Sequence, residues 1–168
     1  MFTINASRET TCCFSGHRQL PTVLRGLKIN LLDTIEGLYK QGYRHFICGG
    51  ALGFDTLAAR AVLYLRTKKQ GICLHLVLPC RNQCDGWSKK DTELYKEILL
   101  SAHEVVYLRD RYEKGCMHQR NRTMVDASSV CVAYLTVATG GTAYTVEYAR
   151  EQGVEVINLG KITAPSSV

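Results

Sequence analysis

Short apolar runs alternate along the chain with longer segments in which apolar residues recur every three or four positions. Runs typical of strands occupy residues 10–14, 44–48, 72–78, 104–108, 129–135 and 154–159. Helical periodicity is clearest after Pro21, a favoured first position of a helix, and the predicted helix ends at Gly42. Further helices are predicted from residue 55 or 56 to 65, after a Ser88–Asp91 capping box, and over 117–127 and 142–152.

This alternation predicts an α/β fold: a Rossmann-like, doubly wound and mainly parallel sheet with helices on both faces. Right-handed crossovers then place every strand-to-helix turn at one edge of the sheet. Ligands of such folds bind in the crevice at that edge, near a switch in strand order. For 168 residues we expect a single domain, with a core of about 10–160 and a frayed tail over 161–168.

The turn after the fifth predicted strand carries Gly140, Gly141 and Thr142 at the start of a helix. Glycines permit a sharp turn and close approach of a ligand, and the free N–H groups of a helix N-terminus attract anions. Thr142 can cap the helix and also offer its hydroxyl. The alternative is a tight corner without a ligand, because short glycine motifs are common.

A similar turn follows the first predicted strand. Ser15, Gly16, His17 and Arg18 place a hydroxyl, an open backbone, an imidazole and a guanidinium within four residues. The planar fork of Arg18 suits a phosphate or a carboxylate. The alternative is that His17 and Arg18 only cap nearby carbonyls. The position at the carboxyl end of a strand favours contact with a ligand.

A third turn follows the second predicted strand and contains Gly49, Gly50, Gly53 and Asp55. It lacks the GxGxxG spacing, and no acidic residue ends the next strand, so a nicotinamide dehydrogenase is not indicated. The glycines still permit a phosphate or ribose to approach the backbone. Asp55 either caps the next helix or contacts a ribose or a base; the sequence leaves both alternatives open.

Other polar side chains lie near these turns. Arg120 and Asn121 can face the crevice from a helix, whereas Arg122 fits a solvated surface. Glu147 is the carboxylate nearest the last glycine turn and is a candidate catalytic acid or base for a glycosidic bond; a solvated helical glutamate is the alternative. Trp87 is expected to pack against the core or form part of a lid rather than stack a base.

The composition and charge of the chain limit the kinds of partner that we expect it to bind. The 21 basic and 15 acidic residues give a net charge of +6, which fits an anionic ligand as well as it fits nucleic acid. The basic residues are spread out, so nucleic-acid binding is allowed but not indicated. No apolar run reaches the roughly 20 residues that span a bilayer. The first residues do not resemble a signal peptide, so we expect a cytoplasmic protein.

The eight cysteines form no CxxC pair. Five of them, at positions 12, 13, 48, 73 and 131, fall in strand-like runs, where a free thiol behaves as a small hydrophobe. Cys80, Cys84, Cys116 and His118 could gather around zinc, but their spacing fits no standard site. We therefore expect neither a metal nor a cofactor.

Four motifs, in this order, resemble those of a known family. They are Cys13–Arg18 (CFSGHR), residues 49–55 (GGALGFD), 118–126 (HQRNRTMVD) and 140–145 (GGTAYT). Together with the Trp87–Ser88 loop they resemble the SLOG superfamily, specifically the YpsA-like family of small bacterial proteins, over about residues 12–159. The resemblance implies a Rossmann-like fold that binds nucleotides or nucleotide-derived ligands, without an assigned reaction. Relatives include the LOG phosphoribohydrolases and DprA, which binds single-stranded DNA.

The LOG enzymes carry a PGGxGTxxE motif after the fifth strand and an arginine–lysine pair upstream of it. Their glycines, glutamate and arginine are matched here by Gly140, Gly141, Glu147 and Arg120. Other positions differ: Thr139 replaces the proline, Ala143 and Tyr144 replace the glycine–threonine pair, and Asn121 replaces the lysine. These departures argue against the loop geometry that positions a ribose phosphate in LOG enzymes.

Three functional hypotheses follow. The first is a module that senses or sequesters a nucleotide-derived small molecule, such as an ADP-ribose derivative, in the crevice formed by the glycine turns. The second is hydrolysis of an N-glycosidic or phosphoribosyl bond, with Glu147 assisting and Arg120 steadying the phosphate. The third is binding of single-stranded DNA, although the chain lacks a basic stripe with interleaved aromatics. The apolar helices would also allow a homodimer.

Overall fold

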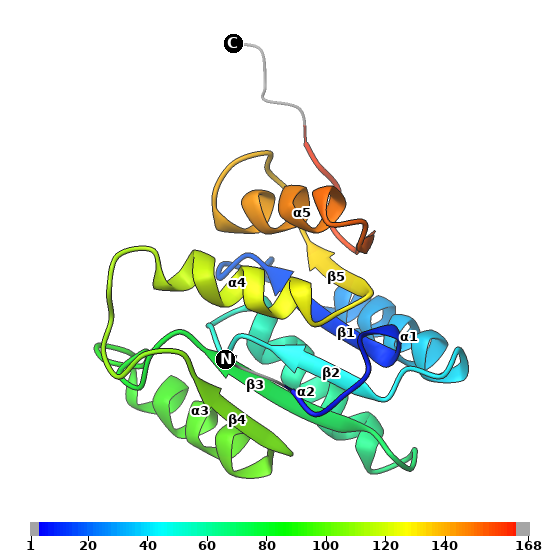
Figure 1. The fold of residues 1–168 in the computed structure, drawn as a ribbon, viewed down its shortest axis with the longest axis horizontal. Coiled ribbons are helices and arrows are strands. Elements are labelled where there is room, and N and C mark those ends of the chain that lie inside the picture. Colours follow the sequence, from blue (N-terminus) through cyan, green and yellow to red (C-terminus); the bar gives the residue numbers. More distant parts are fainter. Residues whose placement is uncertain (1–3, 164–168) are drawn as a thin grey trace.

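The computed structural model describes residues 4–163 and contains one six-stranded parallel sheet (Figure 1). Its strands are β1 (Thr11–Gly16), β2 (His45–Cys48), β3 (Cys73–Leu78), β4 (Glu104–Tyr107), β5 (Val130–Tyr134) and β6 (Glu155–Asn158). Its helices are α1 (Arg25–Lys40), α2 (Phe54–Arg66), α3 (Lys89–Ser101), α4 (Cys116–Asp126) and α5 (Gly141–Glu151), and the short 3-10 helix η1 (Arg8–Thr10) precedes β1. The predicted Rossmann-like α/β fold is confirmed.

Helices bury both faces of the sheet. Phe46 lies at the face covered by α1, α2 and α3, together with Leu31 of α1 and Val62 of α2. The next residue, Ile47, lies at the face covered by α4 and α5, together with Met124 of α4. Successive strand residues point to opposite faces, and both faces are covered, so most strand positions are apolar. This explains why the strands appear in the sequence as continuous apolar runs.

The strand cysteines contribute to this packing. Cys12, Cys13, Cys48 and Cys131 are buried, and Cys73 is half-buried. Burial raises the pKa of the Cys12 and Cys48 thiols well above the ordinary value. They therefore act as small uncharged core residues, as the sequence predicted.

The strand order β4-β3-β2-β1-β5-β6 places a switch point between β1 and β5. The chain runs outward from β1 to β4 on one side, then returns to the other side of β1 for β5 and β6. Because β2, β1 and β5 are neighbours, the glycine turns that follow them lie side by side at the carboxyl edge. The backbone N–H of His17 donates to the carbonyl of Tyr134 at 3.4 Å, which extends the contact of β1 and β5 into these turns.

The first helix begins later than predicted. Leu24 is the N-cap of α1, and its carbonyl accepts from the N–H of Lys28 at 2.8 Å. Pro21 therefore lies before the helix, where Leu20 and Leu24 pack against the core and hold the segment in an irregular turn. Periodicity alone cannot separate this packed turn from the helix that follows it.

The structure rules out the capping roles considered for Asp55 and Thr142. Gly53 with φ 78° is the N-cap of α2, and Gly140 with φ 93° is the N-cap of α5. Both φ values lie in the region that glycine accepts without strain. At α3 the prediction is confirmed, since Oγ of Ser88 accepts from the N–H of Asp91 at 3.1 Å.

Trp87 packs against the core in an edge-to-face contact with Tyr95, with ring centroids 5.3 Å apart. This agrees with the packing role expected from the sequence. Within residues 4–163, no helix combines the length and the apolar character needed to cross a membrane.

Candidate functional site

A cleft of about 280 Å³ lies at the carboxyl ends of β1 and β5. It is lined by Phe14, Ser15, Gly16, His17, Arg18, Ala51, Asp55, Met117, His118, Arg120, Asn121, Gly141 and Thr142. These residues come from the end of β1, the turns that follow β1 and β2, and the N-terminal halves of α2, α4 and α5. The cleft thus brings together nine of the residues predicted to contact a ligand, which lie up to about 130 positions apart in the chain.

The other four predicted ligand residues, Gly49, Gly50, Gly53 and Gly140, do not line the cleft. A Cβ at Gly49 would collide with the guanidinium of Arg120, and one at Gly53 would collide with the backbone of Arg18. A Cβ at Gly50 would collide with a core leucine on β3. These glycines permit close packing behind the cleft, and Gly140 is the exposed N-cap of α5. Their contact with a ligand stays a prediction.

Arg120 forms a buried cation at the base of the cleft and is only 6% exposed. Its Nη1 donates to the carbonyl of Gly49, and its Nε donates to Oδ1 of Asn121 at 2.6 Å. Burial lowers the pKa of Arg120 and the nearby Asp55 carboxyl opposes this shift, so the guanidinium stays protonated. A fixed positive charge therefore borders the cleft.

Asp55 is the carboxylate whose charge most favours the protonated form of Arg120. Its side chain is also 6% exposed, and its Oδ2 accepts from the N–H of Ala51 at 3.2 Å. Burial raises the pKa of Asp55, and the charges of Arg120 and Arg18 oppose that rise. Asp55 thus holds the turn after β2 in place and keeps a carboxyl group at the cleft surface.

His17 links two of the turns. The backbone N–H of Thr136 donates to Nε2 of His17 at 2.9 Å, which requires that nitrogen to be unprotonated. Desolvation lowers the pKa of His17, and this also favours the neutral ring. The imidazole therefore holds the turn after β1 against the loop after β5. Arg18, the next residue, is exposed at the cleft and is its second cation.

The N-terminus of α5 supplies backbone donors. The first bond within the helix runs from the N–H of Tyr144 to the carbonyl of Gly140 at 3.1 Å, so the N–H groups of Gly141, Thr142 and Ala143 precede the helical ladder. Among residues 4–163 no side chain caps this helix. Together with the positive end of the helix dipole, these N–H groups are chemically suited to an anion.

Asn121 has a structural contact that the sequence did not reveal. Its Nδ2 donates to Oγ1 of Thr145 at 2.8 Å, and that hydroxyl donates to the carbonyl of Gly141, also at 2.8 Å. Asn121 thus fixes the first turn of α5 against α4. The sequence shows that Gly141 and Thr145 lie one helical turn apart. It does not show that Asn121 of α4 contacts Thr145.

The summed charge of the lining favours an anion. Two arginines, Arg18 and Arg120, and the N-terminus of α5 outweigh the carboxylate of Asp55. The hydroxyls of Ser15 and Thr142 add hydrogen-bonding groups without charge. The cleft is therefore suited to a ligand with a phosphate group at one end and hydroxyl or ring groups elsewhere.

The positions of Glu147 and His118 differ from those expected for the roles that the sequence suggested. Glu147 is exposed on α5 and is not among the residues that line the cleft, so its catalytic role stays a prediction. His118 lines the cleft, which the sequence did not indicate. Across residues 4–163, no three His, Cys, Asp or Glu side chains gather as a metal site, so His118 and the loop cysteines form no zinc centre there.

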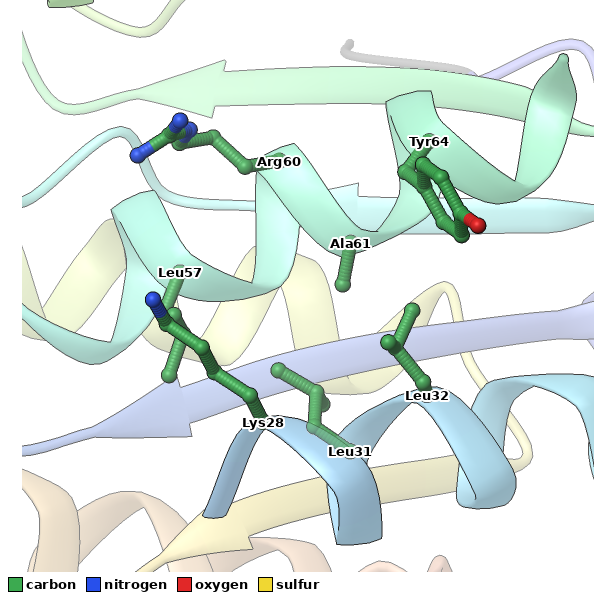
Figure 2. A pocket seen from close by; sticks show the side chains of 7 residues that line it. All are labelled: Lys28, Leu31, Leu32, Leu57, Arg60, Ala61 and Tyr64. Atoms are coloured by element: carbon green, nitrogen blue, oxygen red, sulfur yellow. The ribbon is translucent and has the colours of Figure 1, made fainter. Parts of the chain in front are cut away.

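A second hollow, of about 260 Å³, is an apolar groove between α1 and α2. Figure 2 shows that leucine and alanine side chains of both helices point into the space between them. Its lining residues are Lys28, Leu31, Leu32, Leu57, Arg60, Ala61 and Tyr64. Its polar groups are limited to the side chains of Lys28, Arg60 and Tyr64, whereas the cleft also gathers hydroxyls, an amide and a carboxylate, so the cleft is the better candidate site.

The fold and the cleft define a Rossmann-like domain with a polar cleft at the switch point of its sheet. The chain belongs to the YspA SLOG family, whose model matches residues 12–159, so the resemblance read from the motifs is confirmed. It is 33% identical over 144 residues to the uncharacterized SPbeta prophage-derived protein YoqJ of Bacillus subtilis (strain 168), covering 78% of this chain and 84% of that protein.

Two solved structures share the fold, and both are DNA processing protein A. The protein from Helicobacter pylori, described for its single-stranded DNA binding mode, is 17% identical, with a TM-score of 0.65, over 90% of this chain. DprA from Streptococcus pneumoniae is 20% identical, with a TM-score of 0.67, over 95% of this chain. The chain spans only 65% and 52% of those two chains, respectively.

Proposed function

We propose that the cleft binds a nucleotide or a nucleotide-derived small molecule, and that the protein acts as a sensor or sequestering module. The observation that carries this proposal is the convergence of Arg18, Arg120 and the N-terminus of α5 on one cleft. Backbone donors and guanidinium groups around a shared space are the groups that proteins use for phosphate. The switch point of a doubly wound sheet is also the usual place for such a ligand.

The size of the cleft favours a small ligand. Its volume of about 280 Å³ lies near the lower end of the roughly 300–1,000 Å³ typical of small-molecule sites. In this arrangement a phosphate lies at the first turn of α5, close to Gly141 and Thr142. We assign the ribose hydroxyls to the carboxylate of Asp55 and the hydroxyl of Ser15, which both line the cleft.

Isothermal titration calorimetry against nucleoside monophosphates, nucleoside diphosphates and ADP-ribose tests the proposal. Arg18→Ala removes an exposed cation of the cleft and should weaken binding at least tenfold without loss of folding. Arg150→Ala is the matched control, because Arg150 is exposed in the last turn of the same α5. No heat of binding to any of these ligands, with folded protein, would reject the proposal.

Single-stranded DNA is the alternative ligand, since the similar H. pylori protein binds it. The positive cleft would then hold one nucleotide of a strand. Binding of DNA depends strongly on salt because phosphate contacts release counterions. A gel shift with an oligonucleotide that weakens steeply with salt, while mononucleotides give no heat in calorimetry, would favour this alternative.

A further inference from the structure

An ordered column of three aromatic rings joins α4 to α5 beside the cleft. The rings of His118 and Tyr144 are stacked, with centroids 4.2 Å apart and planes 12° from parallel. The ring of Tyr148 continues the column, 6.5 Å from Tyr144 and 11° from parallel with it. Two of these rings lie on α5, one helical turn apart, and the third lies on α4.

Hydrogen bonds from α4 hold the two tyrosines. Nη1 of Arg122 donates to the hydroxyl of Tyr144 at 2.8 Å, and the hydroxyl of Tyr148 donates to Oδ1 of Asp126 at 2.8 Å. The α4 residues of this arrangement, at 118, 122 and 126, share one face of the helix because they are four residues apart. The column is therefore a rigid surface, held at both hydroxyls.

The end of the column reaches the cleft. His118 is exposed and lines the cleft, whereas Tyr144 and Tyr148 are half-buried. Because Tyr144 covers one face of the imidazole, a ligand in the cleft can meet only the opposite face and the ring edge. An exposed flat ring, already aligned with two more, is a stacking platform that needs no reorganisation when a base arrives.

We infer that His118 is the base-stacking residue of this cleft, so that its ligands carry an aromatic base as well as a phosphate. This inference rests on the proposed function. A base stacked on His118 continues the column as its fourth ring, while the phosphate of the same ligand lies at the N-terminus of α5. Purines are favoured over pyrimidines because their larger ring system covers more of the imidazole.

Calorimetry with AMP, GMP and ribose 5-phosphate tests the inference, because the sugar phosphate lacks only the base. We expect both purine nucleotides to bind the wild-type protein at least fivefold more tightly than ribose 5-phosphate. His118→Ala should remove this difference while leaving the affinity for ribose 5-phosphate unchanged. His118→Tyr, which keeps a flat ring, should restore the preference for the base.

Tyr64→Ala is the matched control, since Tyr64 is an exposed aromatic residue in the groove between α1 and α2 (Figure 2). If the wild-type protein and His118→Ala bind AMP equally well, the column only joins the two helices and the inference is wrong, while the proposed function stands. An equal loss of AMP and ribose 5-phosphate binding in His118→Ala would also overturn base stacking. If the wild-type protein binds none of the three probes, this inference is wrong, and the proposed function fails as well if nucleoside diphosphates and ADP-ribose also give no heat of binding.

Discussion

Gly49 shows how a single residue shapes the cleft. It follows β2 directly, and a Cβ there would overlap the guanidinium of Arg120 and lie 2.8 Å from Oδ2 of Asp55. Gly49→Ala should therefore lower the free energy of unfolding by about 1–3 kcal/mol, the usual cost of overpacking a filled site. Displacement of Arg120 should also weaken binding of a phosphate ligand. Urea denaturation and calorimetry measure the two effects.

Gly26→Ala is the control for this substitution. Gly26 lies in the first turn of α1, where a Cβ would meet no other atom of residues 4–163 within 4 Å. Alanine there should raise the free energy of unfolding by roughly 0.5–1 kcal/mol, because glycine loses more backbone entropy in a helix. If the two alanine variants were equally stable, the packing assigned to Gly49 would be wrong.

At the scale of elements, the cap of α3 offers a test that is independent of the cleft. Ser88→Ala removes the side-chain oxygen that accepts from the N–H of Asp91. The loss should cost about 1 kcal/mol of stability, and Ser88→Thr, which keeps a capping hydroxyl, should cost less. Thermal unfolding measures both variants. Equal melting temperatures for Ser88→Ala and the wild-type protein would show that this cap contributes nothing to stability.

The elements were predictable from sequence because the sheet is buried on both faces. Most strand positions are apolar, and helices such as α1 bury residues at spacings of three and four, for example Leu31, Ile35 and Leu38. Prediction from the sequence failed where two local preferences compete for the same residue. Asp55 is a good helix cap by residue type, but the turn needs its carboxylate as an acceptor for Ala51, and Gly53 takes the cap position.

The candidate site was predictable in part. The turns that follow β1 and β5 could be assigned because parallel topology gathers them at one edge. The neighbours of Arg120 could not, since its contact with the carbonyl of Gly49 joins residues 71 positions apart. His118 escaped notice because its role depends on stacking with Tyr144, which lies on another helix. Such contacts depend on how elements far apart in the sequence pack together, and no local sequence pattern reveals them.

Two histidines of neighbouring strands, the buried His75 and the half-buried His45, make the stability of the whole protein depend on pH. Nδ1 of His45 lies 3.0 Å from Nε2 of His75, whose Nδ1 lies 3.0 Å from Oε2 of Glu104. Desolvation lowers the pKa of His45 and of His75 below the ordinary 6.5, and Glu104 opposes the shift at His75. The unfolded chain then binds more protons as the pH falls below about 6.5, so stability decreases in that direction.

This predicts a lower free energy of unfolding at pH 5.5 than at pH 7, measured by urea denaturation. The raised pKa of Asp55 acts in the opposite direction, so the contribution of His45 is isolated by comparison with His45→Gln. The variant should lose less stability than the wild-type protein between the two pH values. An identical pH dependence would mean that His45 does not contribute.

We propose that the cleft binds a nucleotide-derived ligand, and thermal unfolding of the whole protein with AMP is the sharpest test of this claim. A ligand at about a hundred times its dissociation constant adds roughly 2.7 kcal/mol of stability. For a chain of this length that corresponds to a rise of roughly 5–10 °C in melting temperature. We predict this rise for the wild-type protein and a smaller one for Arg18→Ala, with AMP recovered intact by mass spectrometry. Release of adenine during the measurement would indicate the hydrolase instead, and no rise at millimolar AMP, GMP or ADP-ribose would contradict the claim.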